Sequence, residues 1–144
     1  ICPNGPAISA DDRTLYHVDT FGRTVWAFDK HADGTINNRR EFTRLESQTE
    51  GFPDGLTVDN ENRVWLAHWG GGRISCFSPQ GELLGVVQLP VPQITSCAFG
   101  GRDLSTLYIT TAARNLNLDE YPLAGGLFRI ETKTSGFASP AFAG

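Results

Sequence analysis

The sequence predicts an all-β fold made of about three blades of a β-propeller, and two observations support this prediction. A segment recurs along the chain, with copies that start near residues 4, 54 and 96. Within each copy, short runs rich in β-branched and aromatic residues alternate with turns rich in Asp, Asn and Gly. A period of roughly 40–50 residues with several short strands per unit is typical of propeller blades. We therefore treat residues 1–144 as a single partial propeller domain.

The first copy opens on Asn4-Gly5 and continues into an apolar run that ends at Ser9. A polar turn around Asp11-Asp12 follows, and strands are expected at 15–19 and 25–29. Asp side chains close such turns on their own backbone, and Gly or Asn supplies the positive φ angles. The first unit therefore consists of short expected strands joined by tight turns.

The second copy opens on Asp54-Gly55 and repeats this order, with strands expected at 64–68 and 74–78. Asn4 and Asp54 thus occupy equivalent positions of the repeat. An amide oxygen and a carboxylate are hard oxygen ligands of the kind that Ca²⁺ selects. Asn-Gly and Asp-Gly are also strong turn signals, so the dipeptides alone leave a purely structural role open.

The third copy starts at Ser96 and lacks the polar dipeptide of the other two. Strands are expected at 107–111 and 127–131, separated by an insertion. Within the insertion, 112–121 has room for one or two helical turns before Pro122 ends them. Sixteen glycines and eight prolines in 144 residues otherwise disfavour long helices.

Length, charge and cysteine content narrow the class of protein. Three blades cannot close a ring, because propellers use about 4–8 blades, and the end blades would present open sheet edges. A net charge of −4 argues against nucleic-acid binding, and no apolar run reaches the roughly 18 residues of a membrane-spanning helix. The odd cysteine count (Cys2, Cys76 and Cys97) argues against a disulfide framework. We expect reduced thiols and a cytoplasmic location.

The chain contains no methionine, so Ile1 is not expected to be a natural translation start. We expect these residues to be part of a larger propeller, whose other half is absent or is supplied by a second copy of the chain. The expected association surfaces include Phe137, Phe142 and the apolar runs around Leu15 and Leu107.

A series of short motifs spans almost the whole chain. They are Pro3-Asn4-Gly5, Leu15-Tyr16, Asn38-Arg39-Arg40, Pro53-Asp54-Gly55-Leu56-Thr57-Val58-Asp59, Trp65, Trp69-Gly70-Gly71-Gly72-Arg73, Leu89-Pro90-Val91-Pro92, Thr95-Ser96-Cys97-Ala98-Phe99-Gly100-Gly101 and Leu123-Ala124-Gly125-Gly126-Leu127-Phe128. In this order they resemble the C-terminal half of the gluconolactonase/regucalcin family, also called the senescence marker protein family.

The resemblance implies a six-bladed propeller with one divalent cation at the mouth of its central channel. It implies that Asn4 and Asp54 are two of the metal ligands and that Asp54 is the general base of a sugar-acid lactonase. The cation is expected to be Ca²⁺, with Zn²⁺, Mn²⁺, Mg²⁺ or Fe²⁺ as alternatives. The family also uses a glutamate ligand and sugar-gripping arginine and asparagine residues, which belong to the other half. We therefore expect little or no lactonase activity from this chain alone.

Three further residues are candidates for contact with the substrate, namely His17, His68 and Trp69. Trp69 precedes a run of three glycines and is expected near the channel mouth, whereas both histidines also suit a structural role. Trp26 and Trp65 are expected to pack between blades. No serine carries the nucleophile-elbow motif, and the histidines lack zinc spacing.

Two other functions stay open at this point. The alternative to a lactonase is a non-catalytic Ca²⁺-binding or regulatory propeller. The chain would also suit a half-propeller that acts only as a homodimer, in which two copies bring Asn4 and Asp54 toward one axis. Metal-dependent hydrolysis of a lactone would distinguish a lactonase from a non-catalytic propeller. The molecular mass in solution tests whether the chain forms a homodimer.

Overall fold

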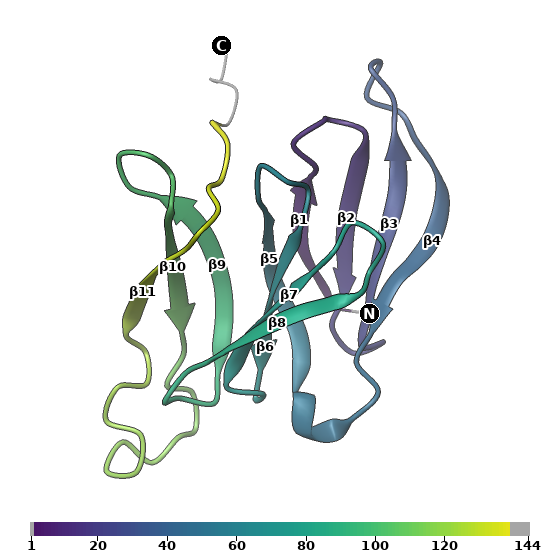
Figure 1. The fold of residues 1–144 in the computed structure, drawn as a ribbon. Helices are drawn as coiled ribbons and strands as arrows, with labels where there is room; N and C mark the ends of the chain where they lie inside the picture. Colours follow the sequence, from purple (N-terminus) through teal and green to yellow (C-terminus); the bar gives the residue numbers. More distant parts are fainter. Residues whose placement is uncertain (1, 139–144) are drawn as a thin grey trace.

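The computed structural model describes residues 2–138 as three antiparallel sheets that lie side by side (Figure 1). We call these sheets blades 1, 2 and 3. Blade 1 contains β1 (Pro3–Ile8), β2 (Thr14–Asp19), β3 (Thr24–Lys30) and β4 (Ile36–Arg44). Blade 2 contains β5 (Phe52–Val58), β6 (Val64–Trp69), β7 (Arg73–Phe77) and β8 (Leu83–Gln88). Blade 3 contains β9 (Ile94–Gly100), β10 (Thr106–Thr111) and β11 (Leu127–Glu131). The all-β prediction is confirmed.

Within the described residues, helical structure is limited to a single 3₁₀ turn, η1 (Gln48–Glu50), between blades 1 and 2. The insertion at 112–121, which has room for helical turns, folds as a series of turns that joins β10 to β11. One of these turns is closed by a bond from the Tyr121 N–H to the Asn117 carbonyl at 2.9 Å. No helix among residues 2–138 has the length and apolar character needed to cross a membrane.

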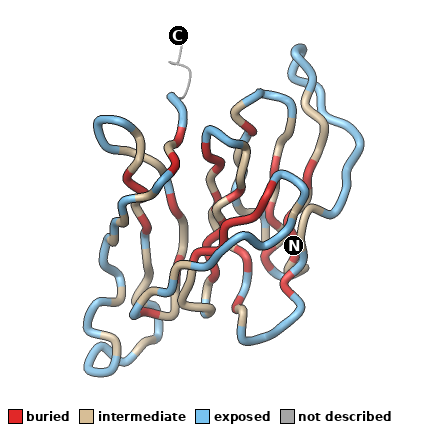
Figure 2. Tube along the Cα trace, viewed as in Figure 1, coloured by how far each residue is buried: buried red, intermediate tan, exposed pale blue. Residues whose placement is uncertain are grey.

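Alternating burial along the strands explains how neighbouring blades hold together. In β2, Tyr16 and Val18 point toward blade 2 and join a core cluster with Leu56, Val58 and Leu66. A second cluster lies between blades 2 and 3 and includes Ala67, Ile74, Ile94, Leu107 and Ile109. Both cores therefore lie between sheets, where Figure 2 shows most of the buried backbone.

The innermost strands β1, β5 and β9 lie next to one another and run in the same direction. Gly5 lies against Leu56, and Gly55 lies against Ser96, so equivalent positions of successive strands are in contact. The strands consequently begin together at one end of the molecule, which we call the N-terminal end of the inner strands.

One of the expected association surfaces differs from the structure. Leu107 is fully buried between blades 2 and 3, so its inclusion was wrong; the alternation of β10 turns it toward blade 2. Leu15 lies on the face of β2 opposite Tyr16 and is half-buried, and Phe137 is exposed. Phe142 lies outside the described residues.

Candidate metal and lactone site

All three inner strands carry an irregularity near their N-terminal ends. The β1–β2 register shifts between Asn4 and Ala7, and the β5–β6 register shifts between Pro53 and Leu56. In blade 3 the shift falls between Thr110 and Thr111 of β10, at the start of β9. A β-bulge redirects the side chains of the extra residues. Asn4-Gly5 and Asp54-Gly55 are therefore positioned by the same kind of bulge.

Asn4 is held by a side-chain hydrogen bond from its own blade. Its Nδ2 donates to Oγ1 of Thr20 at 2.8 Å, and Thr20 is itself buried. This bond occupies the amide nitrogen and leaves Oδ1 as the atom with which Asn4 can bind a cation. A neutral oxygen donor adds coordination without adding charge.

Asp54 is a half-buried carboxyl group. Burial raises the pKa of Asp54 to about 6, and a hydrogen bond from the Gly55 backbone offsets only part of this effect. A bound cation would offset the cost of burying the negative charge of Asp54, so this carboxylate is a favourable position for a cation. The donor set at this end, an amide oxygen and a carboxylate, fits a hard divalent cation.

Among residues 2–138, no three His, Cys, Asp or Glu side chains are grouped closely enough to hold a metal ion. Asn4 and Asp54 are therefore a partial ligand set at most within the described chain. That their side chains converge on one cation in an assembled ring stays a prediction.

Close packing between inner strands makes the position of Asp54 sensitive to its glycine neighbour. A Cβ atom on Gly55 would lie 2.3 Å from Oγ of Ser96 and 2.8 Å from the Thr95 carbonyl oxygen. We expect Gly55→Ala to force β5 away from β9 and to lower the free energy of unfolding by about 1–3 kcal/mol, as overpacked cores do.

The matched control is Gly85→Ala in β8, where an added Cβ would meet no atom within 4 Å. That variant is expected to stay within about 0.5 kcal/mol of the parent chain. Urea denaturation of both variants measures the difference, and equal stabilities would show that the contact between β5 and β9 is not close.

The segment that leads into Asp54 is fixed by arginines from both flanking blades. Arg23 of blade 1 donates from Nε to the Leu45 carbonyl at 2.8 Å and from Nη2 to the Ser47 carbonyl. Arg73 of blade 2 pairs with Glu50 at 2.7 Å. Ser47 and Glu50 also form a capping box around η1. This segment was not anticipated from the sequence, because its partners are distant along the chain.

His68 completes the attachment of this segment from within blade 2. Its ring is fully buried, and Nδ1 lies 2.8 Å from the Glu50 carbonyl oxygen, which can only accept. Nδ1 therefore carries the proton, and Nε2 is buried without a partner among the described residues. The ring is not accessible from the surface of this chain, so its predicted contact with substrate has no support from the geometry and stays a prediction.

His68 is expected to make stability depend on pH. Burial lowers the pKa of His68 from 6.5 to about 4. The folded state thus takes up its proton at lower pH than the unfolded state does. The His68 contribution is fully present above pH 6.5 and is lost as the pH falls toward about 4. The expected loss in free energy of unfolding is on the order of 3 kcal/mol across this window.

The control for this prediction is His68→Asn, which keeps a donor for the Glu50 carbonyl but does not titrate. The difference between the two proteins in urea midpoint should shrink as the pH falls from 6.5 to about 4. A constant difference over that window would show that His68 is not the titrating group.

The other two substrate candidates lie in different surroundings. His17 is half-buried on the face of β2 that points away from blade 2, opposite Trp26 of β3. Trp69 ends β6, pairs with Phe52 and forms an isolated bridge with Gln93. The structure thus places Trp69 at the N-terminal end of the inner strands and His17 on the outer face of blade 1. Contact of either with substrate stays a prediction.

An apolar pocket of about 630 Å³ lies at the opposite end of the inner strands from Asn4 and Asp54. It is lined by Ala7 and Ile8 of β1, Thr57 and Val58 of β5, and Phe99 of β9, among others. None of the predicted site residues contributes to it. Asp12 is the one ionisable residue among the described residues that line it.

A buried carboxylate network organises the turn that follows β5. Oδ1 of Asp59 accepts from the backbone of Glu61 and Arg63, at 2.9 Å each. Oδ2 accepts from Arg63 Nε at 2.7 Å and from Trp65 Nε1 at 3.0 Å. Trp65 in turn packs edge-on against Phe99, with ring centroids 5.8 Å apart. Asp59 thus links the turn of blade 2 to the core between blades 2 and 3.

Comparison with known proteins gives the family and the extent of the match. The family model described as SMP-30/gluconolactonase/LRE-like region matches residues 1–113. Regucalcin of Gallus gallus is 39% identical over 132 residues, which cover 88% of this chain and 44% of the relative. The 6-deoxy-6-sulfogluconolactonase of Pseudomonas putida is 37% identical over 144 residues, covering 98% of this chain and 50% of the relative.

A solved structure shows the same architecture. The structure of the calcium-binding protein regucalcin from Agrobacterium tumefaciens superimposes with a TM-score of 0.88 and 27% identity, covering 96% of this chain and 48% of the other. The chain therefore spans about half the length of the relatives it matches, and its three blades correspond to about half of a six-bladed propeller. The chain belongs to the SMP-30/gluconolactonase/regucalcin family.

Proposed function

We propose that this chain forms half of a metal-dependent lactonase that opens sugar-acid lactones, with Asn4 and Asp54 as metal ligands and Asp54 as the general base. The observation that carries the proposal is the placement of Asn4 and Asp54 in equivalent bulges at the same end of adjacent inner strands. Family membership and the relative named 6-deoxy-6-sulfogluconolactonase support the choice of reaction.

The reaction is hydrolysis of an activated ester. Water adds to the lactone carbonyl carbon, the ring C–O bond breaks, and the product is the open hydroxy acid. A bound divalent cation polarises a carbonyl oxygen and lowers the pKa of a bound water. Asp54 accepts the proton of the attacking water, and its carboxyl group returns a proton to the departing ring oxygen. The pKa of about 6 that burial gives Asp54 belongs to the metal-free chain. A bound cation would lower this pKa, so that the carboxylate is ionised at neutral pH and can accept a proton.

Asn4 has a positioning task in this scheme. The bond from its Nδ2 to Thr20 holds the amide plane, so that Oδ1 is presented in a fixed direction. The remaining ligands and the sugar-binding groups must come from outside the described residues. Ca²⁺ usually takes 6–8 oxygens, and two donors with water would hold it weakly. Ca²⁺ is the first choice of cation, with Zn²⁺, Mn²⁺, Mg²⁺ and Fe²⁺ as alternatives.

The test is hydrolysis of an aldonolactone by the longer protein that contains this chain, after removal of metal by a chelator and after addition of each divalent cation. Metal-restored turnover by the longer protein, with little or none by the 144-residue chain alone, is the expected result. Turnover by a verified monomer of the short chain, or turnover that a chelator leaves unchanged, would contradict the proposal.

A second function is favoured by one observation, namely that the relative from Agrobacterium tumefaciens is described as a calcium-binding protein. The longer protein would then bind Ca²⁺ without hydrolysing lactones. Calorimetric Ca²⁺ binding in the absence of turnover on any aldonolactone would support this alternative. A homodimeric half-propeller would instead show twice the chain mass in solution.

A further inference from the structure

The outer strand of blade 2 has a free edge. β8 is the last strand of its sheet, and within residues 2–138 no strand pairs with its outer side. Blade 2 packs against blade 1 on one face and against blade 3 on the other (Figure 1), so this edge lies in the middle of the row of blades. An unpaired outer strand presents backbone N–H and C=O groups to which another strand can bond.

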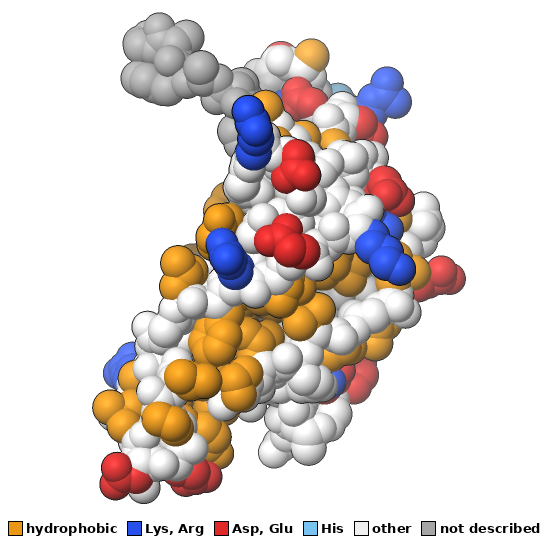
Figure 3. Space-filling model, turned by 60° about the vertical axis from the view of Figure 1, so that its left-hand side comes forward, with side chains coloured by type: hydrophobic (Ala, Val, Ile, Leu, Met, Phe, Trp, Pro, Cys, Tyr) orange, Lys and Arg blue, Asp and Glu red, His pale blue; other side chains and the backbone are white. Residues whose placement is uncertain are grey.

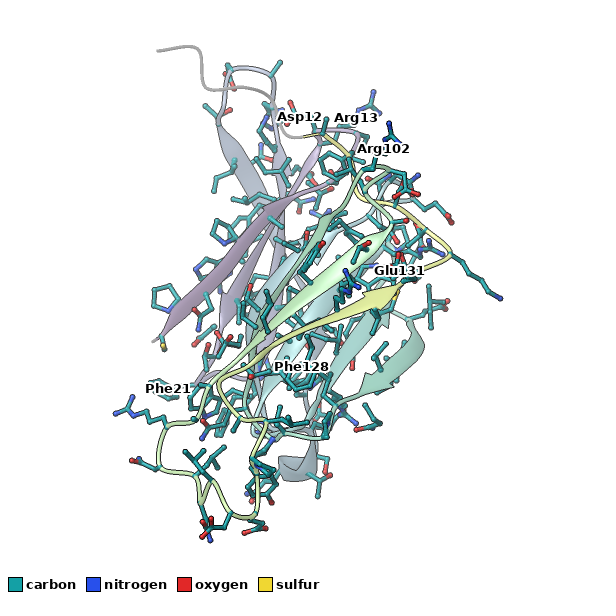
Figure 4. The ribbon with its side chains drawn as sticks, turned by 90° about the vertical axis from the view of Figure 1, so that its left-hand side faces the viewer. Asp12, Arg13, Phe21, Arg102, Phe128 and Glu131 are labelled. Atoms are coloured by element: carbon teal, nitrogen blue, oxygen red, sulfur yellow. The ribbon has the colours of Figure 1, made fainter. Side chains whose placement is uncertain are left out.

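The end of the row at blade 3 is a different case. Figure 4 looks onto this blade, with β11 between the labels of Phe128 and Glu131. On the face that Figure 3 brings forward, hydrophobic side chains gather in the middle of the molecule and toward its lower end, where the insertion of blade 3 lies. Leu118, Leu123 and Leu127 are exposed there. A protein as long as the matched relatives has further residues that can cover an end blade, whereas blade 2 already has both of its neighbours.

β8 has the composition of a strand that is paired on both sides. It contains no charged side chain, and Leu83, Leu84 and Val86 are 57%, 55% and 39% exposed. Its ladder with β7 has one register shift, between Leu83 and Gly85, and is regular beyond it. An exposed, apolar and regular edge favours pairing with another strand.

The outer strand of blade 1 is protected by contrast. β4 carries four charged side chains, Arg39, Arg40, Glu41 and Arg44, and its ladder with β3 has two register shifts. Charged side chains and bulges are the usual means by which edge strands avoid unwanted pairing. β4 and β8 occupy the same place in their blades, yet β8 has none of these charges. The difference indicates that the β8 edge is open to a partner strand.

We propose that β8 is a self-association edge, at which two copies of this protein pair their β8 strands antiparallel about a twofold axis. The two blades then form one continuous sheet of eight strands, four from each copy. Every neighbouring pair within blade 2 is antiparallel, so the new pair continues the existing pattern. A twofold contact uses the same patch on both copies and closes on itself, so association stops at the dimer.

The sequence of β8 suits pairing with its own copy. In the twofold register centred on Val86, this residue lies opposite its symmetry mate, and Gly85 lies opposite Val87. No register over β8 brings like charges together, because the strand has none, whereas two β11 strands centred on Arg129 would place like charges opposite each other. A partner that is recognised by its charge has nothing to pair with on β8, which favours a second copy over an acidic or basic strand.

Pairing at β8 leaves the candidate metal and lactone site accessible in both copies. β5, which carries Asp54, is three strands away from β8 in the sheet. Neighbouring strands lie about 4.8 Å apart, so the contact is roughly 14 Å from β5. The N-terminal end of the inner strands therefore stays open in the dimer, and the contact does not depend on lactone hydrolysis.

The test measures the mass of the longer protein that contains this chain, by sedimentation over a dilution series from about 1 μM to about 1 mM. A dimer that dissociates on dilution is expected. The longer protein is used because the 144-residue chain could also associate through its end blades. Val86→Lys is expected to weaken the dimer at least about tenfold, because lysine near the axis meets the same charge of the other copy.

Ile36→Lys is the matched control, since Ile36 is an exposed apolar residue at the start of β4. This variant is expected to leave the dimer unchanged. Equal weakening by both variants would show that any added lysine disperses the protein, and the proposal would be wrong. A protein that stays monomeric over the whole series, or a Val86→Lys dimer as tight as that of the parent, would also overturn it.

Backbone amide hydrogen exchange, followed by NMR, tests the same contact in the unaltered longer protein. Alternate amides of an edge strand point away from the sheet. In residues 83–88 these amides are expected to exchange at least about tenfold more slowly at the high end of the dilution series than at the low end. Exchange of β8 that is independent of protein concentration, or slowing confined to another segment, would show that the copies do not meet at this edge.

Discussion

Replacing Asp59 with alanine is expected to lower the free energy of unfolding by about 3–5 kcal/mol, the usual cost of breaking a buried ion pair. The Asp59 carboxylate is completely buried and accepts four hydrogen bonds, two of them from the backbone of the turn. Alanine would leave the Trp65 indole N–H and the Nε–H of Arg63 without their acceptor, while Nη2 of Arg63 keeps its bond to Glu61. Urea denaturation of the 144-residue chain measures the loss.

Asp33 is the matched control, because it closes a turn in the same way on the surface. Its Oδ1 accepts from the backbone and hydroxyl of Thr35, at 2.9 and 2.7 Å, and the residue is exposed. Asp33→Ala is expected to cost no more than about 1 kcal/mol. Similar losses for Asp33→Ala and Asp59→Ala would mean that turn closure alone explains Asp59, and that its buried contacts add little.

Replacing Asp54 with asparagine is expected to have opposite effects on activity and stability. Loss of the general base should reduce lactone turnover by the longer protein about 10²–10⁴-fold. In the metal-free 144-residue chain the same change should raise the free energy of unfolding above pH 6 by about 1–2 kcal/mol, after allowance for partial exposure of the group. Asparagine has nearly the same shape as aspartate but no charge to desolvate.

The pH dependence gives the sign of this effect. The folded pKa of Asp54 is raised from 3.8 to about 6, so its folded-state advantage is complete below pH 3.8 and is lost as the pH rises through 6. The stability difference between Asp54→Asn and the parent should therefore grow over this window. Asn4→Ala is the control, since it removes a proposed ligand without changing a titrating group. A variant at Asp54 that is less stable than the parent above pH 6 would refute the desolvation argument.

The repeat made most of the fold predictable from the sequence. The equivalent dipeptides at Asn4 and Asp54 revealed the repeat, and turn residues such as Asp11 and Asp12 marked where a strand ends. These signals are local, so they can be recognised in the sequence without knowledge of tertiary contacts. The insertion at 112–121 was harder, because its alanine, leucine and polar residues permit a short helix as readily as a series of turns.

The surroundings of the candidate site were not predictable in the same way. Arg23, Arg73 and His68 hold the segment before Asp54 from positions 20 or more residues away, or through a backbone carbonyl. No spacing rule connects such residues in a single sequence. Asp59 closes a turn of blade 2, bonds to Trp65 of the same blade, and is linked through Trp65 to Phe99 of blade 3. Contacts between blades therefore could not be predicted from the sequence alone.

The order of strands in the three sheets has a consequence for how the chain folds. Each hydrogen-bonded pair joins strands that are consecutive in the sequence, so the loops closed on pairing are short. The entropy lost on closing a short loop is small, and low contact order is associated with fast folding. A nascent chain can assemble blade 1 as soon as Arg44 has emerged, and blades 2 and 3 then add to a surface that is already in place.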